Sequence, residues 1–393
     1  MFVAAKFSQD PAVIQFEPSK HWGPRFLRTL RRAEITLDAS RSASPAGHSI
    51  FSDDRSVYSA EPWRQRLRAD LIQLHWVATF VDYRPFFQTL PGSVPLVWTL
   101  HDMNPFTGGC HYDGGCARFI EQCGRCPQLD SRRQNDLSNK IWRRKLQALR
   151  ILAPERLHVV TPSKWLGQQV SQSSLLSRFP SSVIPYGLDT EVFQPRNPLV
   201  MREALGISTQ ARVVLFIADS TNDPRKGFKL LASALEDFES NLDIVLLSVG
   251  HGKPLQFSRF PHVHVETIQD DRLLSFIYSC ADVFVVPSLQ DNLPNTILES
   301  IACGTPVVGF RAGGIPDVIL DGETGLLAAK GSVEDLHRGV LELLKNPKRR
   351  DDMSRNCRRL ALESYSIGMQ AFRYLQLYTE LTSKREDSRS PSE

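Results

Sequence analysis

Two acidic residues, Asp291 and Glu299, frame the part of the sequence best suited to chemistry. They belong to the run 283–309, which predicts a buried strand, a polar loop, a helix, a turn and a second strand. Pro294 near the helix start and Gly304 just past its end fit the usual punctuation of a helix. One carboxylate therefore lies ahead of the helix and the other inside it, so the two cannot form a simple i,i+4 pair.

The residues Asn292, Leu293, Pro294 and Asn295 lead into this helix. Backbone N–H groups at a helix start, together with the positive end of the helix dipole, suit a diphosphate. A more ordinary alternative is that Asp291 caps the loop and Glu299 is a charge on the helix surface.

A second candidate loop, residues 218–228, follows the predicted strand 213–217 and precedes a helix beginning near Gly227. It carries Arg225 and Lys226, which could neutralise the negative charge of a departing nucleoside diphosphate. The alternative is a solvated basic pair.

Four of the seven cysteines crowd into one Gly-rich segment, at Cys110, Cys116, Cys123 and Cys126. The Cys-x2-Cys half fits zinc-binding spacing, whereas the first half is looser, and His111 is a candidate substitute ligand. A structural zinc that stiffens the loop, unligated thiols or reversible disulfides, and an iron–sulfur site all stay open.

The elements that must position these residues are short apolar strands that alternate with helices. Strands are predicted over 71–75, 94–101, 157–161, 183–185, 213–217, 244–248, 263–265, 283–287 and 307–309. This alternation predicts an α/β fold with doubly wound parallel sheets, whose strand ends carry ligand sites. His101 stands at such a strand end, where it either meets a ligand or is structural, and Asp102 either orients its ring or caps the turn.

Length and composition set the wider bounds. The 393 residues suggest two domains and therefore a cleft, and 41% hydrophobic with 23% charged residues is typical of a globular protein. A net charge of +4 favours anionic small molecules or a membrane surface, and no nucleic acid partner is expected. Without an apolar run long enough for a bilayer or a signal pattern, the chain is predicted to be cytoplasmic.

Several common motifs are missing from the sequence. It has no apolar strand ending in Asp-x-Asp, which favours chemistry that needs no divalent ion or other cofactor. It also lacks Gly-x-Gly-x-x-Gly and Gly-x-x-x-x-Gly-Lys-Ser/Thr, which removes the usual support for a dinucleotide enzyme or a P-loop ATPase.

Residues 283–309 resemble the donor-site signature of family 4 retaining glycosyltransferases, which have the two-domain GT-B fold. The family pattern is an acid, seven residues and then Glu; here Asp291 stands where Glu is more usual, and Glu299 matches. Residues 98–110 resemble a segment of a bacterial polysaccharide-associated subgroup. The resemblance covers about residues 70–380.

The resemblance implies roles for individual residues. Glu299 would hold the ribose hydroxyls of the donor, and Asp291 would contact the donor sugar with a shorter reach than Glu. Lys226 and Gly227 stand where the family neutralises the leaving diphosphate. The Gly313–Gly314 turn matches the backbone that approaches the donor, with a plain tight turn as the alternative. His101 would meet the donor sugar or phosphate.

The implied activity is transfer of a sugar, with retention at the anomeric carbon, from a nucleotide-sugar donor to a saccharide or lipid-linked acceptor. Exopolysaccharide or cell-surface glycan synthesis is the expected setting. The acceptor hydroxyl would attack while Arg225, Lys226 and the 293–295 backbone stabilise the leaving diphosphate. A noncatalytic nucleotide-sugar-binding partner and a GT-B sugar-nucleotide epimerase are the alternatives. Basic helices at 25–32 and 139–146 suit peripheral binding to anionic lipid, or are solvated faces.

The expected layout has an N-terminal acceptor-side Rossmann-like domain over 1–190 and a donor domain over 191–364. A helix over 365–383 is expected to pack back on the N-domain, and a disordered tail is expected over 384–393. A GT-B N-domain ordinarily opens with a strand, a Gly-rich loop and a helix that help bind the acceptor. Residues 1–6 instead resemble the second strand, so the first strand is expected to be missing and the acceptor half impaired.

Overall fold

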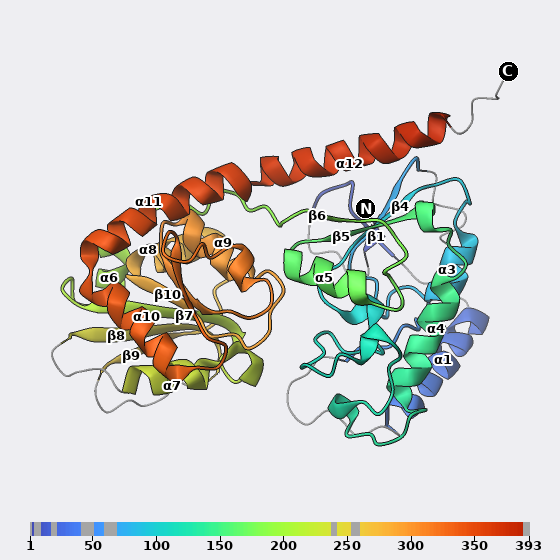
Figure 1. Cartoon of the computed structure of the whole chain (residues 1–393), viewed down its shortest axis with the longest axis horizontal. Coiled ribbons are helices and arrows are strands. Elements are labelled where there is room, and N and C mark those ends of the chain that lie inside the picture. The colour runs from blue at the N-terminus through green and yellow to red at the C-terminus, as the bar shows by residue number, and fades with distance from the viewer. Residues whose placement is uncertain are drawn as a thin grey trace. The chain divides into compact units, whose positions relative to one another are not determined.

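In the computed structural model, the described residues are 2–3, 9–16, 22–40, 51–58, 69–236, 242–252 and 260–387. The chain divides into two compact units. The first comprises Met1–Val160, Gln168–Ser182 and Leu381–Glu393, and the second comprises Thr161–Gly167 and Val183–Glu380. Each unit is built on its own sheet (Figure 1).

The second unit has a six-stranded parallel sheet. Its strands are β7 (Arg212–Ser220), β8 (Ile244–His251), β9 (His262–Val265), β10 (Val283–Val286), β11 (Val307–Phe310) and β12 (Gly325–Ala328). Their order is β12-β11-β10-β7-β8-β9. The first strand in the chain thus lies in the middle, and the order reverses between β7 and β10. In doubly wound sheets, ligands bind at such a reversal, beyond the carboxyl ends of the strands.

Helices cover both faces of this sheet (Figure 1) because alternate strand residues point to opposite sides. Val213 and Leu215 pack with α8 and α9, whereas Val214 and Phe216 pack with α7 and α10. The helices of the unit are α6 (Pro198–Ala204), α7 (Phe228–Glu236), α8 (Asp271–Cys280), α9 (Asn295–Ala302), α10 (Val333–Lys345), α11 (Pro347–Ser364) and most of α12 (Ile367–Asp387).

The first unit has a four-stranded sheet in the order β3-β4-β5-β6, and β3–β4 and β4–β5 are parallel pairs. Its strands are β3 (Ile72–Leu74), β4 (Leu96–Thr99), β5 (Leu157–Thr161) and β6 (Ser181–Val183). A separate two-stranded sheet pairs β1 (Phe2–Val3) with β2 (Ile14–Gln15). The helices are α1 (Trp22–Ser40), α3 (Tyr83–Thr89), α4 (Leu137–Leu149) and α5 (Lys164–Gln172), the last divided between the units.

The predicted α/β class and doubly wound parallel sheets are confirmed, and all nine predicted strands occur with ends within three residues of their expected bounds. β2 and β12 were not predicted. The predicted strand at 1–6 forms at Phe2–Val3 but pairs with β2, and residues 1 and 4–6 lie outside the described part. The basic stretches 25–32 and 139–146 lie within α1 and α4.

The prediction of a disordered tail over 384–393 is wrong for residues 384–387, because they continue α12. Residues 388–393 lie outside the described part of the chain. The expected domain boundary at 190/191 differs from the division at Ser182/Val183, and short stretches on either side of it belong to the other unit. A single change in sequence pattern cannot predict this division, because each unit includes a short segment from the other side of the boundary.

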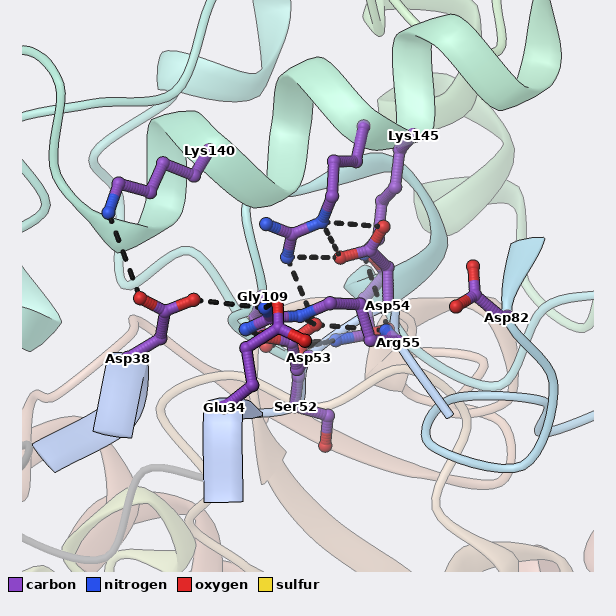
Figure 2. Close-up of polar contacts among 12 residues, drawn as sticks. Glu34, Asp38, Ser52, Asp53, Asp54, Arg55, Asp82, Gly109, Lys140 and Lys145 are labelled. Atoms are coloured by element: carbon purple, nitrogen blue, oxygen red, sulfur yellow. Dashed lines mark hydrogen bonds and ion pairs between the residues drawn. The ribbon is translucent and has the colours of Figure 1, made fainter. Parts of the chain in front are cut away.

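A network of ion pairs ties residues 51–58 to two helices of the first unit (Figure 2). The Arg55 guanidinium lies 2.9 Å from Asp38 and 3.2 Å from Glu34, both on α1. From α4, Arg144 lies 2.5 Å from the buried carboxylate of Asp54. Burial raises the pKa of Asp54 to about 6, against the attraction of Arg144. These contacts fix the segment that packs beside the loop following β4.

Candidate functional site

The strongest candidate site lies in the second unit, at the loops that follow β7 and β10. Residues 221–227 follow β7, and residues 287–294 follow β10. The two strands are hydrogen-bonded neighbours in parallel register, with Val283 opposite Val214. Both loops therefore leave the same edge of the sheet at the point where the strand order reverses, and their side chains meet there.

The predicted residues Lys226 and Asp291 make direct contact. The Lys226 ammonium lies 2.6 Å from the Asp291 carboxylate, and the Arg225 guanidinium lies 3.4 Å from the same oxygen. Arg225 also donates to the Gln290 carbonyl oxygen at 3.0 Å and pairs with Asp223 at 3.2 Å. The two cations are therefore preorganised by acids rather than solvated, and a diphosphate bound here would share them.

The ionisation of Asp291 follows from these contacts. The residue is only 6% exposed, and burial alone would raise its pKa. The charges of Lys226 and Arg225 outweigh that effect and hold the pKa below its ordinary value. One carboxylate oxygen also accepts the Asn292 backbone N–H at 3.1 Å. Asp291 is thus an ionised carboxylate that caps its own loop, as the alternative reading expected, and also holds the cationic loop.

Three predicted glycines allow the loops of this site to pack closely. Gly227 has φ +74°, and a Cβ there would lie 1.9 Å from the Pro287 carbonyl oxygen. Gly313 has φ +57°, and its Cβ would lie 1.7 Å from the Asp291 carbonyl oxygen. At Gly314 a Cβ would lie 1.8 Å from the Asn292 carbonyl oxygen. A side chain at any of these positions would push the Asp291 loop away from its neighbours.

The start of α9 lies directly after the β10 loop. Pro294 is the N-cap residue and supplies no side-chain hydrogen bond, so the first N–H groups of α9 have no side-chain cap. Asn292 and Leu293 are buried, and the Ser163 hydroxyl donates to Asn292 Oδ1 at 2.5 Å, while Asn295 is exposed. Exposed N–H groups at a helix start are suited to the oxygens of an anion.

Glu299 lies within α9, one turn beyond its start, and is half-buried. The Tyr278 hydroxyl donates to Glu299 Oε2 at 2.7 Å. Burial raises the pKa of Glu299 to about 7, the Tyr278 hydrogen bond opposes this shift, and Asp271 adds to it. This environment distinguishes Glu299 from an ordinary charge on a helix surface.

His101 lies in the first unit, beyond the carboxyl end of β4. Its Nε2 lies 3.1 Å from Nδ1 of His75, which follows β3, and the two rings stack with centroids 5.3 Å apart. Burial lowers the pKa of His101, against the charge of Asp102, and lowers that of His75 to about 4. His75 was not among the predicted site residues, although it ends the predicted strand 71–75.

Among the hydrogen bonds of the described residues, none joins the Asp102 carboxylate to the His101 ring. Its Oδ2 lies 2.7 Å from His111 Nδ1, and its Oδ1 accepts the Asn104 N–H at 2.8 Å. The other His111 ring nitrogen lies 2.8 Å from Ser52 Oγ. Both ring nitrogens of His111 are therefore engaged by protein groups, and its role as a substitute metal ligand stays a prediction.

The four clustered thiols lie in the loop between β4 and α4. Cys110, Cys123 and Cys126 are buried, Cys116 is half-buried, and all are free. Burial raises the pKa of each thiol, and the Gly108 N–H donates to Cys123 Sγ at 3.2 Å. Within the described residues, no three His, Cys, Asp or Glu side chains are arranged to hold a metal ion. The structural zinc stays a prediction.

Comparison with known families gives a match within the second unit. Residues 211–346 match the family described as "Glycosyl transferases group 1". This stretch contains the Lys226 loop, the Asp291 loop, α9 and the Gly313–Gly314 turn.

Curated relatives agree with this match. An MMP alpha-(1->4)-mannosyltransferase of Mycolicibacterium hassiacum is 29% identical over 50% of this chain and 48% of its own length. A D-inositol 3-phosphate glycosyltransferase of Catenulispora acidiphila is 29% identical over 44% of this chain and 45% of its own. The sulfoquinovosyl transferase SQD2 of Arabidopsis thaliana is 31% identical over 42% and 30%. The chain thus covers about half the length of the first two and under a third of the last.

Solved structures share the fold of the chain. A sucrose-phosphate synthase of Thermosynechococcus elongatus superposes with a TM-score of 0.60 at 19% identity, over 82% of this chain and 76% of its own. HepE of Anabaena, solved with UDP and glucose, superposes with a TM-score of 0.57 at 15% identity, over 93% and 85%. The fold is GT-B, as the sequence resemblance implied. Among the described helices, none has the length and apolar character needed to cross a bilayer.

Proposed function

We propose that the protein is a retaining glycosyltransferase that uses a nucleotide-sugar donor bound at the carboxyl edge of the second unit's sheet. The observation that carries the proposal is the contact of Lys226 with Asp291 at the reversal of strand order, next to the uncapped start of α9. The family match of residues 211–346 supports it, as do the neighbours solved with UDP or UDP-glucose.

In the proposed complex, the diphosphate of the donor binds at the start of α9. The backbone N–H groups of Leu293 and Asn295 and the cations of Arg225 and Lys226 contact its oxygens, because all of these groups surround the same loop. Glu299 lies further along α9 and accepts hydrogen bonds from the ribose hydroxyls. Asp291 contacts the donor sugar and keeps the two cations in place.

The reaction needs no carboxylate nucleophile. The acceptor hydroxyl attacks the anomeric carbon on the face that the diphosphate leaves, the new C–O bond forms as the C–O bond to phosphate breaks, and a diphosphate oxygen takes the proton. Arg225 and Lys226 stabilise the negative charge that grows on the diphosphate in the transition state. All the positive charge that this step requires comes from protein groups, so we propose that it is independent of a divalent ion.

The finer assignment follows the resemblance of residues 98–110. We assign the protein to exopolysaccharide or cell-surface glycan synthesis at the cytoplasmic side of the membrane, with a saccharide or lipid-linked acceptor. Liposome flotation with and without anionic lipid tests the peripheral association, because attraction of α1 and α4 to such lipid would weaken with added salt.

A donor screen tests the proposal. UDP-, GDP- and ADP-sugars are compared by thermal shift, since a true donor raises the melting temperature by mass action. The best donor, labelled in its sugar, is then incubated with saccharide acceptors. Labelled acceptor supports the proposal. Free nucleotide released without any acceptor would support an epimerase instead, and binding without turnover would support a noncatalytic partner.

A further inference from the structure

We propose that Trp76, His75 and Tyr83 form a binding site for a pyranose ring of the acceptor, at the carboxyl edge of the first unit's sheet. This inference rests on the proposed function and names a substrate-binding site for it. Its three observations are an exposed indole, a pair of stacked imidazoles and an unpartnered buried hydroxyl that line one cavity.

Trp76 supplies the apolar surface. It follows β3 and is 57% exposed, yet its ring lies 5.3 Å from that of His111 at an interplanar angle of 43°. His111 is held in turn by Asp102 and Ser52. The indole is therefore supported on one side and open to solvent. A pyranose ring presents an apolar face of C–H groups, and an aromatic ring of this kind gives it a large contact area.

His75 supplies a neutral hydrogen-bonding group beside the indole. One nitrogen of the His75–His101 contact must carry the proton and the other must accept it, since they lie 3.1 Å apart. The Trp98 indole N–H donates to the His75 carbonyl at 3.3 Å, which fixes the backbone at this position. Within the described part of the chain, the structure gives Nε2 of His75 no partner, so this nitrogen is open to a sugar hydroxyl.

Tyr83 supplies the observation that points most directly to a ligand. The residue is 1% exposed, and its hydroxyl makes no hydrogen bond among the described residues. Its ring is fixed by Trp98, with centroids 5.3 Å apart at 74°. A buried hydroxyl without a partner is unfavourable, so such groups in folded proteins usually have a ligand or water to bind.

A small cavity joins these groups. Its volume is about 10 Å³, and its lining includes the exposed His75 and Trp76 as well as the buried Tyr83 and the half-buried His101. That volume accommodates one oxygen-sized group. A sugar stacked on Trp76 can therefore place one hydroxyl in the cavity and satisfy Tyr83.

The chemistry of the lining selects the ligand class. The exposed lining groups are an indole and a neutral imidazole, and the charge of Asp102 is engaged by His111. These groups suit a neutral polyhydroxyl ring and give no counter-charge for a diphosphate. The cationic loop and the uncapped helix start lie in the second unit. We therefore assign the sugar bound in the first unit to the acceptor, and competition with the UDP-sugar distinguishes it from the donor sugar expected at His101.

Saturation-transfer NMR on the full chain tests the inference, with methyl α-glucoside, methyl α-galactoside and methyl α-mannoside as probes. At least one glycoside is expected to bind, and UDP is expected not to displace it. Trp76→Ala should weaken binding of that glycoside about tenfold. Tyr83→Phe should weaken glycoside binding several-fold. The melting temperature of this variant should not fall, because the substitution removes an unsatisfied hydroxyl and leaves the ring. Ile120→Ala, which alters another exposed apolar side chain of the same unit, should change nothing.

Two results would overturn the inference. Failure of all three glycosides to bind the wild-type protein is one. The other is unchanged glycoside binding in folded Trp76→Ala and Tyr83→Phe variants. Displacement of the glycoside by the UDP-sugar, but not by UDP, would assign the site to the donor sugar and reject the acceptor. Lys226→Ala separates the two proposals, since it should lower donor turnover and leave glycoside binding intact.

Discussion

At the scale of single residues, the buried carboxylate of Asp291 explains why two cations stand ready at this sheet edge. Lys226 and Arg225 lie close to it before any ligand arrives, so their positions do not have to be organised during the reaction. Preorganised charge stabilises a transition state more effectively than charge that must first be gathered. The same pairing reduces the net positive charge, so a donor must compete with Asp291 for Lys226.

Replacing Lys226 tests this arrangement. Lys226→Ala removes the ammonium that lies 2.6 Å from Asp291 and should lower donor turnover about 10²-fold or more. Initial rates with labelled donor measure the loss. Lys229→Ala, which removes an exposed lysine of α7, is the matched control and should be near normal. Similar rates in the two variants would refute the donor-site assignment.

Glu299 predicts a pH dependence of donor binding. Because its folded pKa is raised to about 7, the group is protonated in more acidic solution and becomes a carboxylate as the pH rises through 7. The carboxylate accepts hydrogen bonds from two ribose hydroxyls with both oxygens and more strongly than the neutral acid does, so affinity for UDP should increase over that interval. Titration calorimetry at several pH values measures it, and Glu299→Gln should lose the part of the rise that Glu299 causes. A rise of equal size in both proteins would contradict the assigned role.

The raised pKa of Glu299 also affects the free energy of unfolding, which changes with pH in the direction opposite to UDP affinity. A carboxyl whose pKa is raised on folding binds more protons in the folded state between pH 4.5 and about 7. Its contribution to the free energy of unfolding therefore falls as the pH rises through that window.

Spacing and residue type, together with the resemblance to family 4 glycosyltransferases, singled out Asp291, Glu299, Lys226 and the glycines. His75 and Tyr83 were not predicted, because a lone histidine or tyrosine near a strand has no local signature. Their significance depends on a stacked partner 26 positions away and on a missing hydrogen bond, and neither is visible along the chain.

At the scale of elements, strand order decides which loops meet. Alternating apolar runs predicted β7 and β10, but their adjacency follows from the reversal of order within the sheet. β12 was missed because it is short, begins with Gly325 and follows directly after a turn. β2 was missed because it has only two residues.

The ion pairs between α4 and residues 51–58 predict a stability change. Arg144→Met leaves the Asp54 carboxylate, 4% exposed, without its partner and should lower the free energy of unfolding by roughly 3 kcal/mol. That figure is at the low end for a buried pair because Arg144 is itself 30% exposed. Denaturant unfolding at pH 7.5 measures the change.

A control and a pH series sharpen this test. Lys140→Met removes an exposed lysine 3.9 Å from Asp38 and should cost less than about 0.5 kcal/mol. Because the pKa of Asp54 is raised to about 6, the penalty of Arg144→Met should shrink at pH 5, where the unpaired carboxyl is protonated. An equal penalty at both pH values would show that lost packing, rather than charge, is responsible.

The thiol loop between β4 and α4 tests the zinc prediction directly. Protein purified without chelators should carry about one equivalent of zinc by elemental analysis, and the double variant Cys123→Ser, Cys126→Ser should lose it. Wild-type protein free of metal, with its thiols titratable after denaturation, would instead support unligated cysteines.

At the scale of the whole molecule, the two units differ in how closely they match known families. The family match covers residues 211–346, all within the second unit, so the donor chemistry is supported by both sequence and geometry. The similar solved structures extend over both units, and at 19% and 15% identity they share the fold of this chain. The proposed acceptor site therefore rests on the side chains of the first unit itself.

The three glycines beneath the Asp291 loop limit how this protein can be redesigned. Libraries meant to change its donor preference gain nothing from randomising Gly227, Gly313 or Gly314, because even a methyl group there would fall within 2 Å of a carbonyl oxygen. Diversity is better directed to side chains such as Asn295, which is exposed at the start of α9. The backbone beneath the proposed donor site is thus a fixed template, and any new selectivity must come from the groups that stand on it.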